Sequence, residues 1–178
     1  GVQPRTLEVL AGLGVTDELV DRGNQAVRLQ LHFGHRVVPV RLFDIGIDDT
    51  AYPYLLFVSQ AETERIIGEY VTSRGVNLER GVELTEIVQT GRCVSCRLRH
   101  RNGREETLNA RYVVGCDGAH STVRDQAGIA FEGRAYPQTF VLADLEAEGI
   151  EPDWAHAFIS ANAILFFLPL GLPTPWRL

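Results

Sequence analysis

The spacing of apolar residues predicts two short helices at the start of the chain. Leu7, Leu10 and Leu13 recur at helical spacing across residues 4–13. Pro4 suits the first turn of this helix, because proline lacks the N–H that would be unpaired there. Thr16 is predicted to cap a second helix that ends before Gly23. The chain therefore begins with a pair of helices.

A different period follows and predicts a β-hairpin. Apolar and polar residues alternate over residues 27–33, as expected for a half-buried strand. Gly34 and His35 can form a tight turn into a second strand at residues 36–42. Pro39 places that second strand at the edge of a sheet, since proline cannot donate to a neighbouring strand.

The clearest helix is predicted over residues 59–75. Ser59 and Glu62 have the spacing of a capping box, in which each side chain pairs with the backbone of the other residue. Short strands are predicted on both sides of this helix, at residues 55–58 and 76–81. This segment therefore predicts one strand–helix–strand unit.

The second half of the chain predicts mainly β-structure. Residues 82–111 alternate around an Asn102-Gly103 turn, which indicates an antiparallel meander. The meander leads into "YVVGC" (112–116), a continuous apolar run typical of a strand that is covered on both faces. Three further strands are predicted in "TFVLADLEAE", "HAFISA" and "AILFFLPL". The predicted fold class is mixed α/β.

Composition narrows the function classes. The 178 residues are 45% hydrophobic and carry a formal net charge of -6, which argues against non-specific binding to nucleic acid. No apolar stretch approaches the roughly 18 residues of a membrane span, so no membrane partner is expected. The three cysteines favour a reducing, cytoplasmic setting. Cys93 and Cys96 are three apart on a predicted strand and face opposite ways, so no metal site is predicted.

The stretch "VVGCDGAHSTVR" (113–124) has the parts of a nucleotide contact. Asp117 follows an apolar run and can accept hydrogen bonds from a ribose, and Gly118 allows a ligand to approach the backbone. Ser121 can cap a helix that contains Arg124, a candidate partner for phosphate. The same residues are also compatible with an ordinary turn and helix cap, and chemistry alone does not choose between the two interpretations.

The order of motifs along the chain resembles the class A flavoprotein aromatic hydroxylases, typified by para-hydroxybenzoate hydroxylase. "YVVGCDGAHSTVR" resembles the Asp-Gly motif of that family, which is associated with binding of FAD and NAD(P)H. Gln60 matches a glutamine that the family places near FAD. The resemblance implies a partial Rossmann-like FAD-binding domain at residues 1–130, with the hairpin 27–42 as an insertion. It also implies the start of a substrate-binding β-sheet domain at residues 131–178.

The resemblance further implies the function. It predicts an FAD-dependent, NAD(P)H-using monooxygenase that hydroxylates a small aromatic or polyketide-like substrate through a flavin hydroperoxide. Arg5 is a candidate contact to FAD, and Phe166 is a candidate substrate contact. Alternatives are a flavin-dependent halogenase, epoxidase or reductase of the same fold, or a flavin-free binding module. No catalytic residue or oligomeric state is predicted.

Two family motifs are not found in the chain. The G-x-G-x-x-G pattern that holds the FAD pyrophosphate does not occur, and neither does the later Gly-Asp motif. The chain is therefore expected to be the central part of the enzyme and to bind FAD weakly or not at all by itself.

Overall fold

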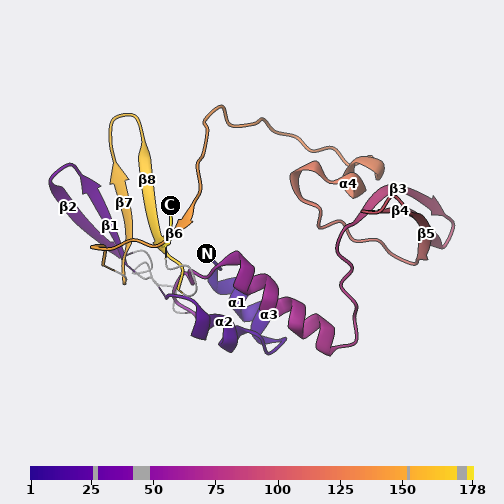
Figure 1. The fold of residues 1–178 in the computed structure, drawn as a ribbon, viewed down its shortest axis with the longest axis horizontal. Helices are drawn as coiled ribbons and strands as arrows, with labels where there is room; N and C mark the ends of the chain where they lie inside the picture. The colour runs from indigo at the N-terminus through magenta and orange to yellow at the C-terminus, as the bar shows by residue number, and fades with distance from the viewer. Residues whose placement is uncertain (26–27, 42–48, 152, 172–175) are drawn as a thin grey trace. The chain divides into compact units, whose positions relative to one another are not determined.

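The computed structural model describes residues 1–25, 28–41, 49–151, 153–171 and 176–178. It contains two compact units. The first unit combines Gly1–Asn77 with Thr139–Leu178, and the second unit is Leu78–Gln138. Helices and strands occur together, which confirms the predicted mixed α/β class (Figure 1). The predicted division into cofactor and substrate domains concerns function and stays a prediction.

Three helices of the first unit lie where the sequence predicts them. They are α1 (Pro4–Ala11), α2 (Thr16–Arg22) and α3 (Gln60–Ser73). The predicted cap of α2 is wrong, because Val15 occupies the N-cap position and Thr16 is the first helical residue. The buried Thr16 hydroxyl instead donates to the carbonyl oxygen of Leu7, at 2.7 Å. This bond satisfies a buried polar group and ties α2 to α1.

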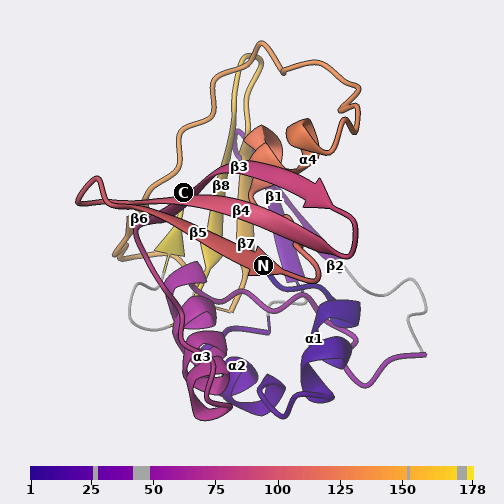
Figure 2. The same ribbon diagram turned by 90° about the vertical axis from the view of Figure 1, so that its right-hand side faces the viewer.

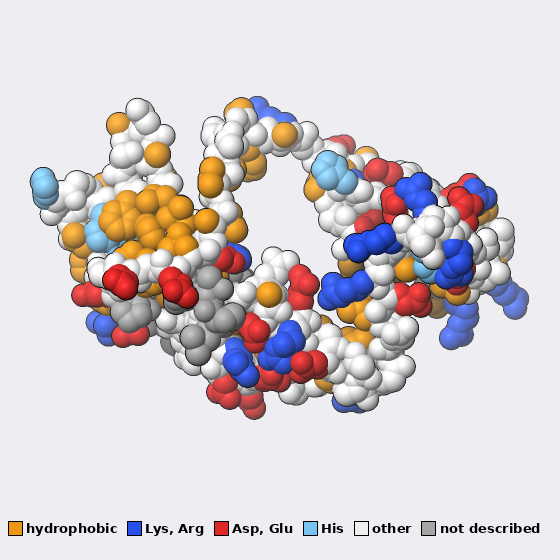
Figure 3. Space-filling view, in the orientation of Figure 1, with side chains coloured by type: hydrophobic (Ala, Val, Ile, Leu, Met, Phe, Trp, Pro, Cys, Tyr) orange, Lys and Arg blue, Asp and Glu red, His pale blue; other side chains and the backbone are white. Residues whose placement is uncertain are grey.

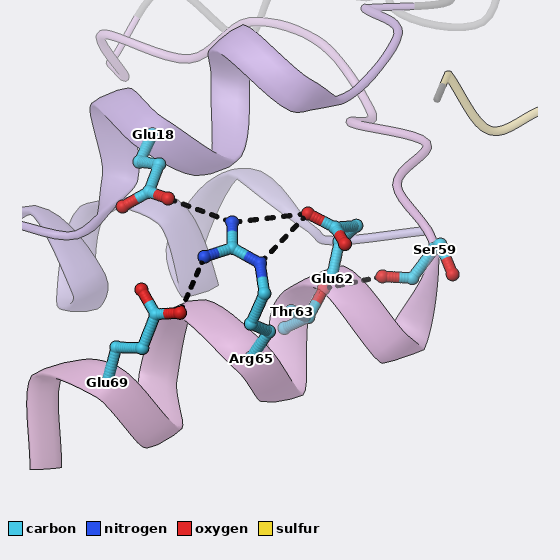
Figure 4. Close-up of polar contacts among 6 residues, drawn as sticks. All are labelled: Glu18, Ser59, Glu62, Thr63, Arg65 and Glu69. Carbon is cyan, nitrogen blue, oxygen red and sulfur yellow. Dashed lines mark hydrogen bonds and ion pairs between the residues drawn. The ribbon is translucent and has the colours of Figure 1, made fainter. Parts of the chain in front are cut away.

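The capping box predicted for α3 is also wrong. Ser59 lies at the N-cap, but its side chain makes no capping hydrogen bond. Its carbonyl oxygen accepts from the Thr63 backbone N–H and from the Thr63 hydroxyl, each at 3.1 Å (Figure 4). The carboxylate of Glu62 binds Arg65 instead of the backbone.

Arg65 is the centre of an acidic cluster that connects two helices. Its guanidinium contacts Glu62 at 3.2 Å and Glu69 at 2.9 Å on α3, and Glu18 of α2 at 2.9 Å (Figure 4). Hydrogen bonds to Glu18, Glu69 and Glu62 raise the pKa of Arg65 above its already high normal value. These partly exposed ion pairs orient α2 against α3 but add little stability.

The core of the first unit lies beneath these helices. Its buried members are Leu7, Val15, Leu19, Leu56, Val58 and Ile66. Residues 55–58 supply much of it, but they do not form the predicted strand. They make two isolated bridges, Val2 with Leu56 and Asn24 with Phe57. The apolar run therefore correctly indicated burial and incorrectly indicated a strand.

The first unit also contains a six-stranded sheet, in which a predicted hairpin lies at one edge and strands from the end of the chain complete the rest. Its order is β2 (Arg36–Arg41), β1 (Arg28–Phe33), β7 (Ala155–Ile159), β8 (Ile164–Pro169), β9 (Trp176–Arg177) and β6 (Asp144–Leu145). The predicted hairpin is confirmed as β1 (Arg28–Phe33) and β2 (Arg36–Arg41), although its end residues 27 and 42 lie outside the described residues. Pro39 does lie in an edge strand. β1 pairs in parallel with β7 (Ala155–Ile159), which places the hairpin beside strands from the end of the chain (Figure 1).

The late strands match the sequence predictions in part. β7 and β8 (Ile164–Pro169) form as predicted, and β9 (Trp176–Arg177) follows them. The predicted strand over "TFVLADLEAE" is wrong except for β6 (Asp144–Leu145). Its first apolar residues, Phe140 to Leu142, are exposed. No described strand pairs with those three residues. Their preference for β-structure depends on packing against a neighbouring strand, so it does not produce a strand here.

The second unit is the predicted antiparallel meander with a short helix against it (Figure 2). It comprises β3 (Val82–Thr90), β4 (Cys93–His100), β5 (Glu105–Ala110), the 3-10 turn η1 (Gly118–His120) and α4 (Thr122–Gln126). Gln126 anchors α4 to an irregular position in β3. Its amide accepts from the Ile87 N–H at 2.6 Å and donates to the Thr85 carbonyl at 2.9 Å.

Two further strand predictions are wrong. Residues 76–81 and 112–116 form no strand. Tyr112 and Val114 are 84% and 82% exposed, although a continuous apolar run usually indicates burial on both faces. No described strand lies in register with this run, and an unpaired run buries neither face. Among the described residues, no helix is long and apolar enough to cross a membrane.

Candidate functional site

The loop that carries Asp117 is shaped by two glycines. A Cβ atom on Gly115 would lie 2.7 Å from the Cβ of Val123, so only glycine allows α4 to pack this closely. Gly118 has a φ of +77°, in the left-handed region that side chains disfavour. Apart from Gly118 and its two chain neighbours, no described residue has a heavy atom within 4 Å of where its Cβ would be. The backbone at Gly118 is therefore open to an approaching molecule.

Asp117 is held by the start of α4. One carboxylate oxygen accepts a hydrogen bond from the Ser121 hydroxyl, and the other accepts from the Val123 N–H at 3.2 Å. These bonds favour the ionised form and lower the pKa of Asp117, with the Ser121 hydroxyl as the largest cause. Asp117 is exposed, so its carboxylate still has lone pairs available to a ligand.

Ser121 caps α4 as the sequence predicts. Its hydroxyl oxygen accepts from the Arg124 N–H at 3.1 Å, which satisfies one of the unpaired donors at the helix start. Because the same hydroxyl donates to Asp117, one buried side chain fixes both the carboxylate and the helix.

Arg124 is turned back toward its own loop. Its guanidinium donates to the carbonyl oxygens of Gly118 at 3.4 Å and Ala119 at 2.8 Å, and lies 4.2 Å from the ring centroid of Phe131. The Nε atom is buried and has no hydrogen-bond partner among the described residues. In this arrangement Arg124 supports the Gly118 turn, and one of its donors remains unused. A phosphate contact by Arg124 stays a prediction.

The loop therefore has a defined chemistry. It combines an oriented, ionised carboxylate with an open glycine backbone, on a turn braced by an arginine. A carboxylate of this kind accepts hydrogen bonds from hydroxyl groups, such as those of a ribose or a sugar alcohol chain. The structure brings together Asp117, Gly118, Ser121 and Arg124, as the sequence predicts.

The other predicted site residues belong to the first unit, and each has separate partners. Arg5, in α1, is exposed and forms ion pairs with Glu8, at 2.8 Å, and with Asp49. Gln60 is the first residue of α3, and its amide donates to Glu64 at 3.1 Å. Phe166 lies on β8 and is 46% exposed.

Sequence reasoning missed a histidine pair in the sheet of the first unit. His32 of β1 and His156 of β7 are 124 positions apart, and their ring nitrogens lie 3.1 Å from each other. The His32 ring stacks on Phe158, with ring centroids 4.2 Å apart. Strand periodicity shows which side chains share a face of one strand, but it does not show that β1 and β7 are neighbours. No local signal could have paired these two residues.

Replacing Ser121 with alanine is expected to loosen the Asp117 loop. The change removes the cap of α4, which costs about 1 kcal/mol, and it raises the pKa of Asp117 because the largest cause of its lowering is lost. A carboxyl group whose pKa is lower in the folded than in the unfolded state stabilises the fold at pH values above its unfolded-state pKa. This stabilisation is lost as the pH falls through the folded-state pKa. The deficit of Ser121→Ala should therefore be largest at neutral pH and shrink in acid.

Urea unfolding at several pH values and NMR titration of the Asp117 carboxyl would measure both effects of Ser121→Ala. Ser73→Ala is the matched control, because the hydroxyl of that exposed serine donates to the Tyr70 carbonyl at the end of α3. An unchanged Asp117 pKa in Ser121→Ala would contradict this account of the loop.

Comparisons with known proteins find related sequences over nearly the whole chain. The sequence profile of a family described as "FAD binding domain" matches residues 1–169. The chain is 35% identical over 177 residues to 6-methylpretetramide 4-monooxygenase of Streptomyces rimosus, covering 99% of this chain and 31% of that protein. It is 26% identical over 173 residues to pentachlorophenol 4-monooxygenase of Sphingobium chlorophenolicum, covering 95% and 32%. The chain thus spans about a third of the length of these relatives.

A solved structure shows the same fold. The p-nitrophenol 4-monooxygenase PnpA from Pseudomonas putida DLL-E4 superposes with a TM-score of 0.79 at 22% identity. The match covers 98% of this chain and 45% of that one. The predicted fold class is therefore confirmed for the arrangement of the helices and strands as well as for their presence.

Proposed function

Because this chain belongs to the FAD binding domain family, we propose that it serves an FAD-dependent, NAD(P)H-using monooxygenase that hydroxylates an aromatic or polyketide-like compound. The observation that supports this most directly is the Asp117–Gly118 loop, where an ionised carboxylate lies beside an open backbone. The names of two relatives, a 6-methylpretetramide 4-monooxygenase and a pentachlorophenol 4-monooxygenase, support the same proposal.

The residues of the loop fit part of FAD. Asp117 would accept hydrogen bonds from hydroxyl groups of the cofactor, and Gly118 would allow the cofactor to approach without a side chain in the way. Arg124 would hold the turn in this shape through its bonds to backbone carbonyls. When bound, FAD supplies the redox chemistry with NAD(P)H and O2, and the protein supplies binding and orientation.

Roles for the remaining site residues are part of the proposal. Gln60, at the exposed start of α3, is proposed to contact FAD through its amide. Arg5 is proposed as a further FAD contact, for which it would have to leave Glu8 or Asp49. Phe166 is proposed to contact the aromatic substrate. The three free cysteines support a reducing, cytoplasmic setting for this reaction.

The test uses protein expressed from the complete coding sequence. Native mass spectrometry should show bound FAD, and NAD(P)H oxidation should speed up when an aromatic substrate is added. Mass spectrometry of the product should show one added oxygen. A flavin-free protein with no NAD(P)H oxidation contradicts the proposal, and a halogenated or saturated product would favour a halogenase or a reductase.

A further inference from the structure

An apolar groove lies next to the histidine pair on the sheet of the first unit. It has a volume of about 240 Å³, and His32, Phe158 and Leu165 are among its lining residues. In Figure 3, apolar side chains gather over β7 and β8, with histidine beside them. Phe158 and Leu165 are register partners on β7 and β8 and are 37% and 42% exposed, so a ligand can reach both side chains.

The hydrogen bonds of the histidine pair define which atom of His32 is available. The Nε2 atom of His156 lies 3.2 Å from the Glu151 carbonyl oxygen, which can only accept, so this Nε2 carries a hydrogen. In neutral His156 the Nδ1 atom is then an acceptor, and His32 Nε2 donates to it across 3.1 Å. The remaining ring nitrogen of His32, Nδ1, has no partner among the described residues.

The charge state of His32 leaves Nδ1 as an acceptor. Burial lowers the pKa of His32, and the neighbouring His156 lowers it further, so the ring is neutral at pH 7. A neutral ring with hydrogen on Nε2 has a lone pair on Nδ1. His156 is buried and holds the His32 ring in position, while stacking on Phe158 fixes its plane.

The rest of the groove selects the kind of ligand. None of its lining residues carries a formal charge, which disfavours a carboxylate or phosphate group. The Ser160 hydroxyl is already used, because it donates to the Ala163 carbonyl and accepts from the Ala163 N–H, both at 3.1 Å. The groove therefore combines aromatic and aliphatic walls with the acceptor Nδ1 of His32, which fits a flat ring that carries a hydroxyl group.

We propose that His32 binds a hydroxyl group of the aromatic substrate through Nδ1 and thereby selects hydroxylated rings over their ethers. This inference rests on the proposed function, because it assigns a substrate contact of that same reaction. It places the contact on the sheet face that carries Phe158 and Leu165. Phe166 lies on the opposite face, because its register partner is Ala157, next to Phe158 in β7.

Two probes separate the hydroxyl contact from simple apolar binding. Equilibrium dialysis of 2-naphthol and of 2-methoxynaphthalene against the FAD-loaded, full-length protein gives the ratio of their two affinities. We expect the wild-type protein to prefer 2-naphthol roughly tenfold, as for one hydrogen bond made in an apolar site. His32→Phe keeps the stacked ring and removes the acceptor, so the ratio should fall to about one while 2-methoxynaphthalene still binds.

Matched variants make the result specific. His35→Phe makes the same change in the exposed hairpin turn and should keep the wild-type ratio. His32→Gln restores an acceptor and should recover part of the preference even if His32→Phe folds poorly. A preference that survives both His32 variants, or one that is lost in Phe166→Leu instead, overturns the assignment of His32. Protein that purifies without FAD contradicts the proposed function itself, and this inference fails with it.

Discussion

Replacing Asp117 with alanine is expected to weaken FAD binding or the use of NAD(P)H while the protein still folds. The carboxylate is exposed and oriented by Ser121 and Val123, so the substitution removes a charged acceptor without opening a cavity. A hydrogen bond to a charged group contributes about 1.5–3 kcal/mol of binding free energy. Its loss should therefore weaken cofactor binding roughly 10- to 100-fold. Flavin content after dialysis and the KM for NAD(P)H in the full-length enzyme would measure the effect.

Asp125→Ala is the matched control for this substitution. Asp125 lies on α4 and its side chain is 67% exposed. Asp125→Ala removes the same charge together with an ion pair to Arg124 at 3.3 Å, but it leaves the bonds that hold Ser121 and Val123 to Asp117 in place. Wild-type flavin content and unchanged kinetics in Asp117→Ala would refute the cofactor role. Equal losses in both variants would show that the general charge of the loop or its Arg124 brace matters and not the position of Asp117.

Local signals predicted most of the regular structure. The helices α1, α2 and α3 and the hairpin of β1 and β2 are each defined locally, by apolar period, glycine and turn residues. The details at helix starts were less predictable, because Thr16 and Glu62 each have a competing partner. Thr16 bonds a carbonyl of α1, and Glu62 bonds Arg65. The local sequence therefore predicts where the helices lie, but tertiary contacts determine which partners the polar side chains at the helix starts bind.

Long-range pairing accounts for most of what the sequence did not predict. The Asp117 loop was predictable because Asp117, Gly118, Ser121 and Arg124 all lie within eight residues. The histidine pair was not, because it depends on β1 pairing with β7. The need for a distant partner also explains why the strand predicted at residues 112–116 is wrong. An apolar run shows that a strand would need a neighbour to pair with, but it does not show whether the fold provides one.

A large loss of stability is expected from truncating Leu56. Its side chain is fully buried among α1, α2 and α3, and a Cβ on Gly23 would lie only 2.7 Å from its Cδ1 atom. Leu56→Ala removes this packing and leaves a cavity, which costs about 2–5 kcal/mol of unfolding free energy. Leu13→Ala makes the same change at a side chain that is 43% exposed, and should cost no more than about 0.5 kcal/mol.

Urea unfolding of both leucine variants would test this and would also separate stability from cofactor binding. Leu56 exchanges backbone hydrogen bonds with Val2, at 2.7 and 3.1 Å, and those bonds do not depend on its side chain. The path of the chain into Gln60, four residues later, should therefore persist in the folded fraction of Leu56→Ala. In the full-length protein, we expect that fraction to bind FAD as the wild type does. A loss of unfolding free energy below about 1 kcal/mol would mean that the three helices move together and fill the cavity. The core would then repack more easily than the close contact between Leu56 and Gly23 indicates.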